Sequence, residues 1–371
     1  MFLIPLVALV ATPQPVHQTI DQPFEARASS IEGITELHAT RDWHDALGGT
    51  RSVLINDFFL DSDTSVILEL ERRDVTDRDA DLRLGETGQL APSDVVMLGG
   101  AVAGDPSSFA FLAFSDSMTM GFIQTDGEQY VVSSGPHGED LPTVVYNLGE
   151  ISNDTISLRD IACQALQVPG VDAATPQQTT TTARRGVVPC RVADVAIDTD
   201  TEFRTDLFGG DANAARDYAT MLVGAISEVY ERDLNVKLNI TFLRIWESTD
   251  PWNGVDTIDQ LFQFRDYWAA NETGVDRDLA HHLSGRPLGG GVAWVGVVCD
   301  QDFGFAHSAD LNGFFPYPLQ NQSTQNWDFM VTAHEWGHNF GAPHTHQQAP
   351  LPNIDNCGNG DCSGTPGTIM S

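Results

Sequence analysis

Three histidines and one glutamate near the carboxyl end of the chain have the spacing of a catalytic metal site. The segment that starts at residue 334 reads HEWGHNFGAPH, so the histidines are His334, His338 and His344 and the acid is Glu335. A spacing of four residues puts the first two imidazoles on one face of a helix, one turn apart. Three neutral imidazoles leave one position of a zinc ion open, as in catalytic zinc sites.

The residues between these histidines predict how all three reach one ion. Gly341 can take a positive φ and end the helix, so that the chain turns and His344 supplies a third nitrogen. Glu335 can act as general base towards water and return the proton to a leaving amine, without ligating the ion. Because zinc acidifies water and polarises carbonyl groups, the expected reaction is the hydrolysis of peptide bonds. A helix that contains two histidines only by chance is the alternative, and the glycine and third histidine at fixed offsets disfavour it.

A methionine near the end of the chain supports this interpretation. The last five residues read GTIMS, which places Met370 twenty-six positions after His344. A methionine turn downstream of the extended histidine motif is the second signature of metzincin zinc proteases. The chain therefore resembles the metzincins, and the segments GGVAWVGVVC (290–299) and AHEWGHNFG (333–341) are most similar to the reprolysin or ADAM-type branch. Residues 100–130 loosely resemble the propeptide of that branch.

The resemblance implies a fold and a cofactor. The implied fold is of the α+β class, a zincin-like catalytic domain with a twisted five-stranded mixed sheet, long helices and an active-site cleft. One catalytic zinc ion is implied, and calcium binding is compatible with the family although no residue of the sequence identifies a site. An extended substrate is expected to pair with an edge strand, which we assign to Val292, Ala293, Trp294 and Val295.

Two features depart from the reprolysin pattern. Thr345 follows the third histidine, where ADAM-type proteins usually have aspartate, and the chain stops one residue after Met370. Because the resemblance implies a further helix beyond that point, we expect a catalytic domain truncated after the methionine turn. The alternative function is a zinc-bearing adhesion or binding protein that no longer cleaves. Loss of Glu335 or of a histidine ligand would favour that alternative, and none is lost.

The chain divides into four segments by composition. Residues 1–12 contain an apolar run of about ten residues, the length of a signal-peptide core, so we expect secretion to an extracellular or periplasmic location; a buried N-terminal strand is the alternative. Residues 13–167 predict a mainly β, propeptide-like domain. Residues 168–185 (VPGVDAATPQQTTTTARR) predict an exposed linker, and Arg184–Arg185 would suit a processing protease. Residues 186–371 are the expected catalytic domain, so the protein is predicted to be a zymogen.

Hydrophobic patterns predict the elements that position the motif. Short apolar or alternating runs predict strands in the N-terminal half at residues 66–70, 109–114 and 130–132. In the C-terminal half, apolar residues at helical spacing predict helices over residues 212–234, 257–270 and 327–340. Shorter apolar runs predict strands over residues 192–197, 236–245, 279–283 and 292–298. The histidine motif therefore lies on the last predicted helix.

Five cysteines are further candidates for chemistry: Cys163, Cys190, Cys299, Cys357 and Cys362. Cys357 and Cys362 are near enough in sequence to close a small disulfide loop. Cys163 lies just before the linker, and the resemblance makes it a candidate cysteine switch, because a propeptide thiolate occupies the open zinc position in matrixins and many ADAM-type zymogens. The surrounding residues DIACQ do not match their usual switch motif, so an ordinary thiol is the alternative.

Three other histidines are weaker candidates for metal binding. His281 and His282 lie in a predicted strand, where packing is favoured over a second metal site. His346 follows the motif by two residues and is predicted to face solvent in a loop.

The charge of the chain restricts its partners. It has 52 acidic and 19 basic residues, a formal net charge of -33. Such a surface repels nucleic acids and anionic membranes, so neither is expected as a partner. No segment after the first apolar run approaches the ~18 apolar residues of a membrane span. A protein or peptide substrate is the partner that the motif predicts, and the sequence leaves the oligomeric state open.

Overall fold

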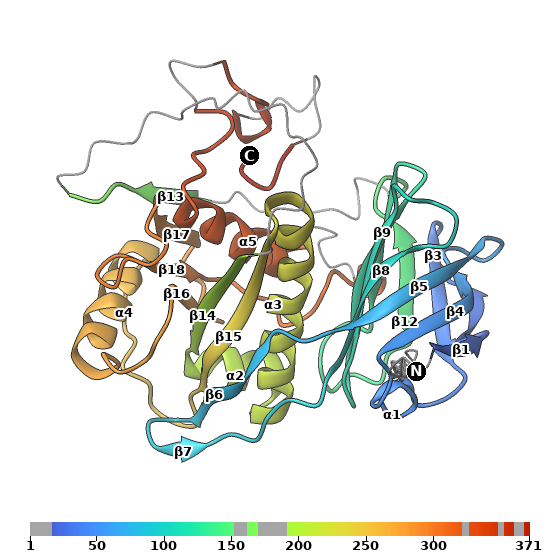
Figure 1. Ribbon diagram of the computed structural model, residues 1–371, viewed down its shortest axis with the longest axis horizontal. Helices are drawn as coiled ribbons and strands as arrows, with labels where there is room; N and C mark the ends of the chain where they lie inside the picture. Colours follow the sequence, from blue (N-terminus) through green and yellow to red (C-terminus); the bar gives the residue numbers. More distant parts are fainter. Residues whose placement is uncertain (1–16, 152–161, 170–190, 321–325, 348–351, 360–366) are drawn as a thin grey trace, which may run out of the picture.

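The computed structural model describes residues 17–151, 162–169, 191–320, 326–347, 352–359 and 367–371, and its strands form two sheets (Figure 1). The ten-stranded sheet A is built from the N-terminal half alone. The eight-stranded sheet B carries the longer helices, and α3 lies between the two sheets. The mixed α+β class and the strand-rich N-terminal half are therefore as predicted.

Several predictions lie outside the described residues. These are the signal segment 1–12, residues 170–185 of the linker and the arginine pair within it. The domain boundaries accordingly stay predictions. No helix in the described part of the chain is long and apolar enough to cross a membrane.

Sheet A curves around a core of its own. Its neighbouring strands pair antiparallel, except β1 and β4, which run parallel. Because side chains alternate between the faces of a strand, one face of the sheet can be apolar throughout, and it packs with Trp43 from α1 (Trp43–Leu47) around Phe24 and Phe58. In spatial order the strands are β1 (His17–Asp21), β4 (Ser52–Phe59), β5 (Ser65–Arg73), β8 (Val96–Val102), β9 (Phe109–Phe114), β10 (Thr119–Thr125), β11 (Glu128–Ser133), β12 (Thr143–Asn147), β3 (Ile34–Ala39) and β2 (Phe24–Ala28).

Sheet B combines strands from both halves of the chain. Five come from residues 191–371, as the family resemblance implied: β17 (Gly290–Trp294), β18 (Phe305–Ser308), β16 (Leu279–Leu283), β14 (Arg191–Thr199) and β15 (Val236–Ile245). Three more come from the N-terminal half: β13 (Ala162–Leu166), β6 (Thr76–Leu84) and β7 (Gly88–Gln89). Residues 191–371 thus supply the five strands expected of them, and the N-terminal half extends this sheet, because β13 pairs with β17 at one edge and β6 with β15 at the other. Edge strands have unpaired backbone groups that favour such additions.

Helices cover both faces of sheet B (Figure 1). α3 (Ala212–Leu234) and α5 (Trp327–Asn339) lie on the face towards sheet A, and α4 (Thr257–Asn271) lies on the opposite face. α3 has the predicted bounds because Asp211 caps its first turn, its side chain accepting from two N–H groups, and Asn235 ends it in the left-handed conformation. Short helices complete the fold: α2 (Thr201–Phe208) and the 3-10 turns η1 (Pro318–Gln320) and η2 (Cys357–Asn359).

Buried charges join the two halves. Glu228 on α3 pairs with Arg73 of sheet A. On sheet B, Arg83 of β6 lies 3.0 Å from Glu272, which also pairs with the buried Arg244 at 2.6 Å. A buried charge is costly unless it is paired. The N-terminal half therefore supplies arginine partners for acidic side chains that residues 191–371 alone would leave partly unpaired.

Candidate metal centre

Helix α5 carries the first two histidines of the motif and its glutamate, and hydrogen bonds to α3 and to sheet B fix its position. Tyr230 of α3 donates a hydrogen bond to the Ala333 carbonyl (2.7 Å). At the other end, the buried amide of Asn339 donates to the carbonyls of Trp294 (2.9 Å) and Phe305 (3.1 Å), which belong to β17 and β18. The helix is thus held by α3 on one side and by two strands of sheet B on the other.

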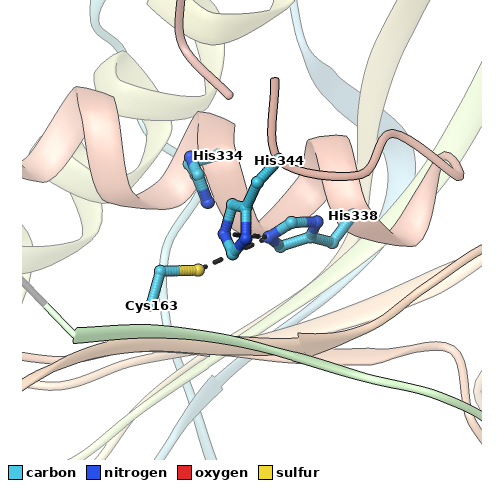
Figure 2. Close-up of side chains that lie close together, drawn as sticks. All are labelled: Cys163, His334, His338 and His344. Atoms are coloured by element: carbon cyan, nitrogen blue, oxygen red, sulfur yellow. Dashed lines mark hydrogen bonds between the residues drawn. The ribbon is translucent and has the colours of Figure 1, made fainter. Parts of the chain in front are cut away.

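The turn after α5 brings the third histidine to the first two. Gly341 follows the helix with a φ of 96°, in the left-handed region that its place in the motif predicted. The ring centroids of His338 and His344 are then 4.7 Å apart, and His334 lies 4.7 Å from His338 and 5.2 Å from His344. Figure 2 shows the three rings converging from α5 and the chain beyond it.

The hydrogen bonds of the outer ring nitrogens define the tautomers. Nδ1 of His334 lies 2.6 Å from the Ile369 carbonyl, and Nδ1 of His338 lies 2.7 Å from the Ala342 carbonyl. A carbonyl only accepts, so both Nδ1 atoms donate and both Nε2 atoms are bare acceptors. Yet Nε2 of His338 is 3.2 Å from Nε2 of His344, and the buried Nε2 of His334 has no hydrogen-bond partner among the described residues. Bare nitrogens that converge in this way fit a cation bound between them.

The distances fit a zinc ion. Zn–N bonds of about 2.0–2.1 Å put two tetrahedral nitrogen ligands about 3.4 Å apart, close to the 3.2 Å between His338 and His344. A thiolate at about 2.3 Å from zinc lies about 3.5 Å from each nitrogen, and Sγ of Cys163 is 3.4 Å from Nε2 of His338 (Figure 2). One ligand atom from each of Cys163 and the three histidines lies within 4.8 Å of all the others. Across the described ranges, no other group of three or more such side chains is as close.

Burial keeps these imidazoles in the form that binds metal. It lowers the pKa of His334 to about 4 and that of His338 to about 3, and it also lowers the pKa of His344. Metal ligation requires neutral imidazole. The three rings therefore need no deprotonation at neutral pH before they bind an ion.

Glu335 lies beside the histidines and faces β17. Its side chain is fully buried, and its Oε1 accepts a hydrogen bond from the Cys163 thiol at 3.1 Å. A Cβ at Gly291 would overlap its carboxylate, so the glycine of β17 leaves the space that Glu335 fills. Burial raises the pKa of Glu335 to about 8, against the opposite effect of the Cys163 hydrogen bond. Burial and the neighbouring Glu335 together raise the pKa of Cys163.

The predicted substrate strand is not at the edge of sheet B. The four residues assigned to it lie in β17 or directly after it: Val292, Ala293, Trp294 and Val295. β13 pairs with β17 in parallel, Cys163 lying opposite Gly291, and the Leu166 carbonyl accepts from the N–H of Val295 (3.0 Å). In the uncut chain a strand of the N-terminal half therefore covers the edge that residues 191–371 leave open, and the assignment of this edge to a substrate stays a prediction.

The methionine turn supports the first histidine. Sδ of Met370 occupies the space that a Cβ at Gly337 would need, so the helix glycine makes room for the methionine. The Ile369 carbonyl binds Nδ1 of His334, as described above. The Met370 carbonyl accepts from the N–H and from Oγ1 of Thr345, at 2.9 and 3.1 Å. Thr345, which replaces the usual aspartate, thus ties the residue after the third histidine to the turn.

Some residues around the site were missed or only partly predicted from the sequence. Asp355 is buried and accepts hydrogen bonds from the hydroxyls of Thr368 and Ser371, which hold the methionine turn. No local spacing marks Asp355, because these partners lie 13 and 16 residues further along the chain. His346 lies in a turn, as predicted, but it is only partly exposed, because its ring stacks on His344, with centroids 5.0 Å apart and planes at 17°.

The remaining cysteines lie apart from the metal centre. In the described part of the chain, Cys163 and Cys299 are free thiols. Cys190 and Cys362 lie outside the described residues, so the disulfide loop between Cys357 and Cys362 stays a prediction.

The histidine pair of the predicted strand packs inside sheet B. His281 and His282 are fully buried in β16. Nε2 of His281 lies 2.9 Å from the Ser308 hydroxyl, and Nδ1 of His282 lies 2.9 Å from Nδ1 of His307. Packing, which the sequence favoured over a second metal site, agrees with this placement.

Comparisons with known proteins match the C-terminal half. Residues 190–371 match the Reprolysin_5 model of metallo-peptidase family M12. The disintegrin and metalloproteinase domain-containing protein B of Aspergillus fumigatus is 28% identical over 167 residues, which are 42% of this chain and 20% of that protein. The chain therefore spans about a fifth of that relative's length.

Two solved structures also align with the chain, at low similarity. Metalloproteinase-II from Bacteroides fragilis aligns over 90% of each chain, with a TM-score of 0.44 and 12% identity. A chaperone–substrate complex aligns over 66% of this chain and 29% of the other, with a TM-score of 0.32 and 12% identity. The family match confirms, for residues 190–371, the resemblance to the reprolysin branch of the metzincins.

Proposed function

We propose that this chain, whose residues 190–371 have the pattern of reprolysin-type metallo-peptidase family M12, is a zinc-dependent endopeptidase secreted as an inactive precursor. One observation carries the proposal: three imidazole nitrogens and the Cys163 sulfur converge on one point beside the buried carboxylate of Glu335. His334, His338 and His344 would hold the ion. Zinc bound there supplies Lewis acidity towards a carbonyl group and acidifies water.

Glu335 is proposed as the general base. It takes a proton from the attacking water and passes it to the leaving amine. Its setting supports this, because its buried carboxylate lies beside the histidine cluster, where it can exchange a proton with a group bound at the ion. A catalytically inactive zinc-binding protein is the alternative, and the presence of Glu335 within reach of the histidine cluster speaks against it.

Three contacts of β13 support latency in the unprocessed chain. The Cys163 sulfur takes the fourth position around the point of convergence, where a substrate carbonyl or water would need to be. Its thiol also donates to Glu335, which engages the proposed base. In addition, the main chain of β13 pairs with β17 along the strand that would bind a substrate. Latency is thus proposed to arise from Cys163 and from occupation of the cleft together.

Secretion and processing complete the proposal. The apolar run within residues 1–12 is proposed as a signal peptide, residues 13–167 as a propeptide domain and residues 168–185 as the linker that is cut. Protein or peptide substrates follow from the peptidase family. The strongly acidic chain, with a formal net charge of -33, favours substrates that are not themselves acidic.

The metal is tested by counting zinc per folded chain in three proteins. Wild type is expected to hold one zinc ion, and His338→Ala to lose it, because one of three histidine ligands is removed. Glu335→Ala is expected to keep the ion and to lose peptidase activity by several orders of magnitude after processing. Zinc content unchanged in His338→Ala would refute the ligand assignment, and wild-type turnover in Glu335→Ala would refute the base.

Latency is tested on the uncut chain with Cys163→Ser, and Cys299→Ser serves as the control because Cys299 is the other free thiol of the described residues. If the sulfur caps the metal, Cys163→Ser is expected to raise peptidase activity before any cleavage, and a mercurial reagent is expected to do the same to wild type. Cys299→Ser should leave latency unchanged. Should Cys163→Ser also stay fully latent, occupation of the cleft alone would account for inhibition.

A further inference from the structure

The three ligand histidines are held in two different ways. Nδ1 of His334 and Nδ1 of His338 each donate to a main-chain carbonyl, at 2.6 and 2.7 Å. Nδ1 of His344 lies instead 3.3 Å from Oε1 of Gln347, an exposed side chain, and this distance is longer than the usual range of such hydrogen bonds. Because an exposed side chain keeps much of its rotational freedom, Gln347 alone fixes the ring of His344 less firmly than a carbonyl of the main chain would.

His346 supplies a further contact to the third ligand. Its ring lies nearly parallel to that of His344, with planes at 17° and centroids 5.0 Å apart. Rings at this separation attract each other in an offset-stacked arrangement. Nδ1 of His346 is buried and has no hydrogen-bond partner in the described part of the chain, so packing and not a hydrogen bond at this nitrogen holds the ring.

Gly358 of η2 leaves the space that the ring of His346 fills. A Cβ at Gly358 would overlap Nδ1 and Cε1 of that ring, so no larger residue fits there unless the ring moves. The segment before η2 is tied to the turn that carries His346, because the N–H of Ile354 donates to the carbonyl of Thr345 at 2.9 Å. His346 thus contacts the third ligand and also a glycine whose segment is attached to the same turn.

We propose that His346 is a positioning residue for the third metal ligand, whose orientation it sets by stacking on the imidazole of His344. The inference rests on the proposed function, because the orientation of His344 matters where its Nε2 and that of His338, 3.2 Å away, share an ion. His346 is not among the four side chains whose ligand atoms converge, so it acts through His344 and not as a ligand. Stacking needs only a ring face, and a ring without nitrogen atoms is therefore expected to do the same.

The contact is tested by measuring zinc affinity in competition with a chelator, on the uncut full chain. His346→Ala is expected to weaken zinc binding about tenfold, the usual effect of losing a group that orients a ligand. His346→Phe keeps an aromatic face beside His344 and is expected to restore most of the affinity. His137→Ala is the control, because His137 is a partly exposed histidine outside the metal centre whose ring lies 6.0 Å from that of Phe208; it should leave the affinity unchanged.

Gly358→Ala tests the support behind His346. The φ of Gly358 is not in the left-handed region, so alanine adds no backbone strain there and acts only through its methyl group. In wild type this methyl group is expected to displace the ring and weaken zinc binding, whereas in His346→Ala the space is vacant and it should have no further effect. Urea unfolding with and without zinc separates positioning from folding. Positioning changes the stabilisation that zinc adds, whereas a purely structural role lowers both stabilities equally.

The outcomes separate this inference from the proposed function. A wild-type chain that binds no zinc would contradict the proposed function. Zinc held equally tightly by wild type and His346→Ala, or equal losses of stability with and without zinc, would overturn the inference alone. A Gly358→Ala effect that persists in His346→Ala would do the same. A loss in His346→Phe as large as in His346→Ala would assign the effect to the ring nitrogens and overturn stacking.

Discussion

Acidification should destabilise the C-terminal half of the chain through buried histidines that do not belong to the candidate metal centre. His282 is fully buried between the rings of Trp252 (centroids 5.0 Å apart) and Phe264 (5.3 Å), and its Nδ1 meets Nδ1 of His307. Burial lowers its pKa to about 3, helped by the positive charges of Arg286 and Arg244 and by His281, and opposed by a hydrogen bond with the backbone of Thr199. Burial lowers the pKa of His307 as well.

The sign and size follow from the difference between folded and unfolded pKa values. A histidine whose pKa is lowered on folding stabilises the fold above its unfolded pKa of 6.5, and this contribution is lost as pH falls from there towards about 3. Each pH unit below 6.5 is worth ~1.4 kcal/mol. Lowering pH from 7 to 5 should therefore cost about 2 kcal/mol of unfolding free energy through His282.

A single pH profile would not isolate this effect. Burial raises the pKa of Asp200 to about 7. A carboxyl whose pKa is raised on folding contributes stability that is lost as pH rises, so Asp200 stabilises the fold on acidification and opposes His282. The comparison of wild type with His282→Phe removes this term, because Asp200 is present in both proteins. Phenylalanine suits the site because aromatic rings flank it on two sides.

The assay is urea unfolding of the two zinc-free proteins at pH 7 and at pH 5. The stability of His282→Phe relative to wild type is expected to improve by about 2 kcal/mol between the two pH values. His38→Phe is the control, because His38 lies on β3 of sheet A, beside Glu36 and in contact with solvent. A relative stability that stays within about 0.5 kcal/mol, the usual scatter of such differences, would show that His282 does not couple protonation to unfolding.

Three further predictions concern the supports of the site and its processing. Asn339→Leu leaves the Trp294 and Phe305 carbonyls without their donor and should cost about 2–4 kcal/mol of stability while one zinc ion is still bound; an unchanged unfolding midpoint would contradict the argument. Asp355→Ala should loosen the methionine turn and weaken zinc binding about tenfold in competition with a chelator, with the exposed Asp302→Ala as control; equal zinc affinities would remove Asp355 from the metal support. N-terminal sequencing of the secreted protein should find a start near Gly186, after Arg184–Arg185, and a start upstream of Thr179 would exclude that cleavage.

Elements with local signals could be predicted from the sequence. α3 could be placed to the residue because it has a capping aspartate, apolar residues at helical spacing and an asparagine that ends it. The helix with the histidine motif spans Trp327–Asn339, close to the predicted 327–340, since the motif fixes both its face and its terminating glycine. In both cases the information lies within one or two turns of chain.

Elements that depend on a distant partner could not be predicted from the sequence. β6 reads TDRDADLRL, with few apolar residues, and becomes a strand of sheet B because it pairs with β15 and because Arg83 meets Glu272. The same holds for Asp355, whose partners reach it only after the chain has turned. The alternation of Ala80, Leu82 and Leu84 in β6 does not identify the distant strand it pairs with, and the approach of a loop leaves no periodic signal in the sequence.

Cys163 shows how register can replace a motif. Its neighbours do not match the usual switch sequence, yet its sulfur lies 3.4 Å from Nε2 of His338. The pairing of β13 with β17 fixes this position, and a slip of one residue would turn every side chain of the strand to the opposite face. Cys163 would then point towards α4 and Leu166 towards the metal centre, so main-chain register determines which side chain of the strand meets the histidines. The residues around Cys163 therefore only have to form a short strand. For this reason a comparison of its neighbours with the usual switch motif does not detect its place beside the histidines.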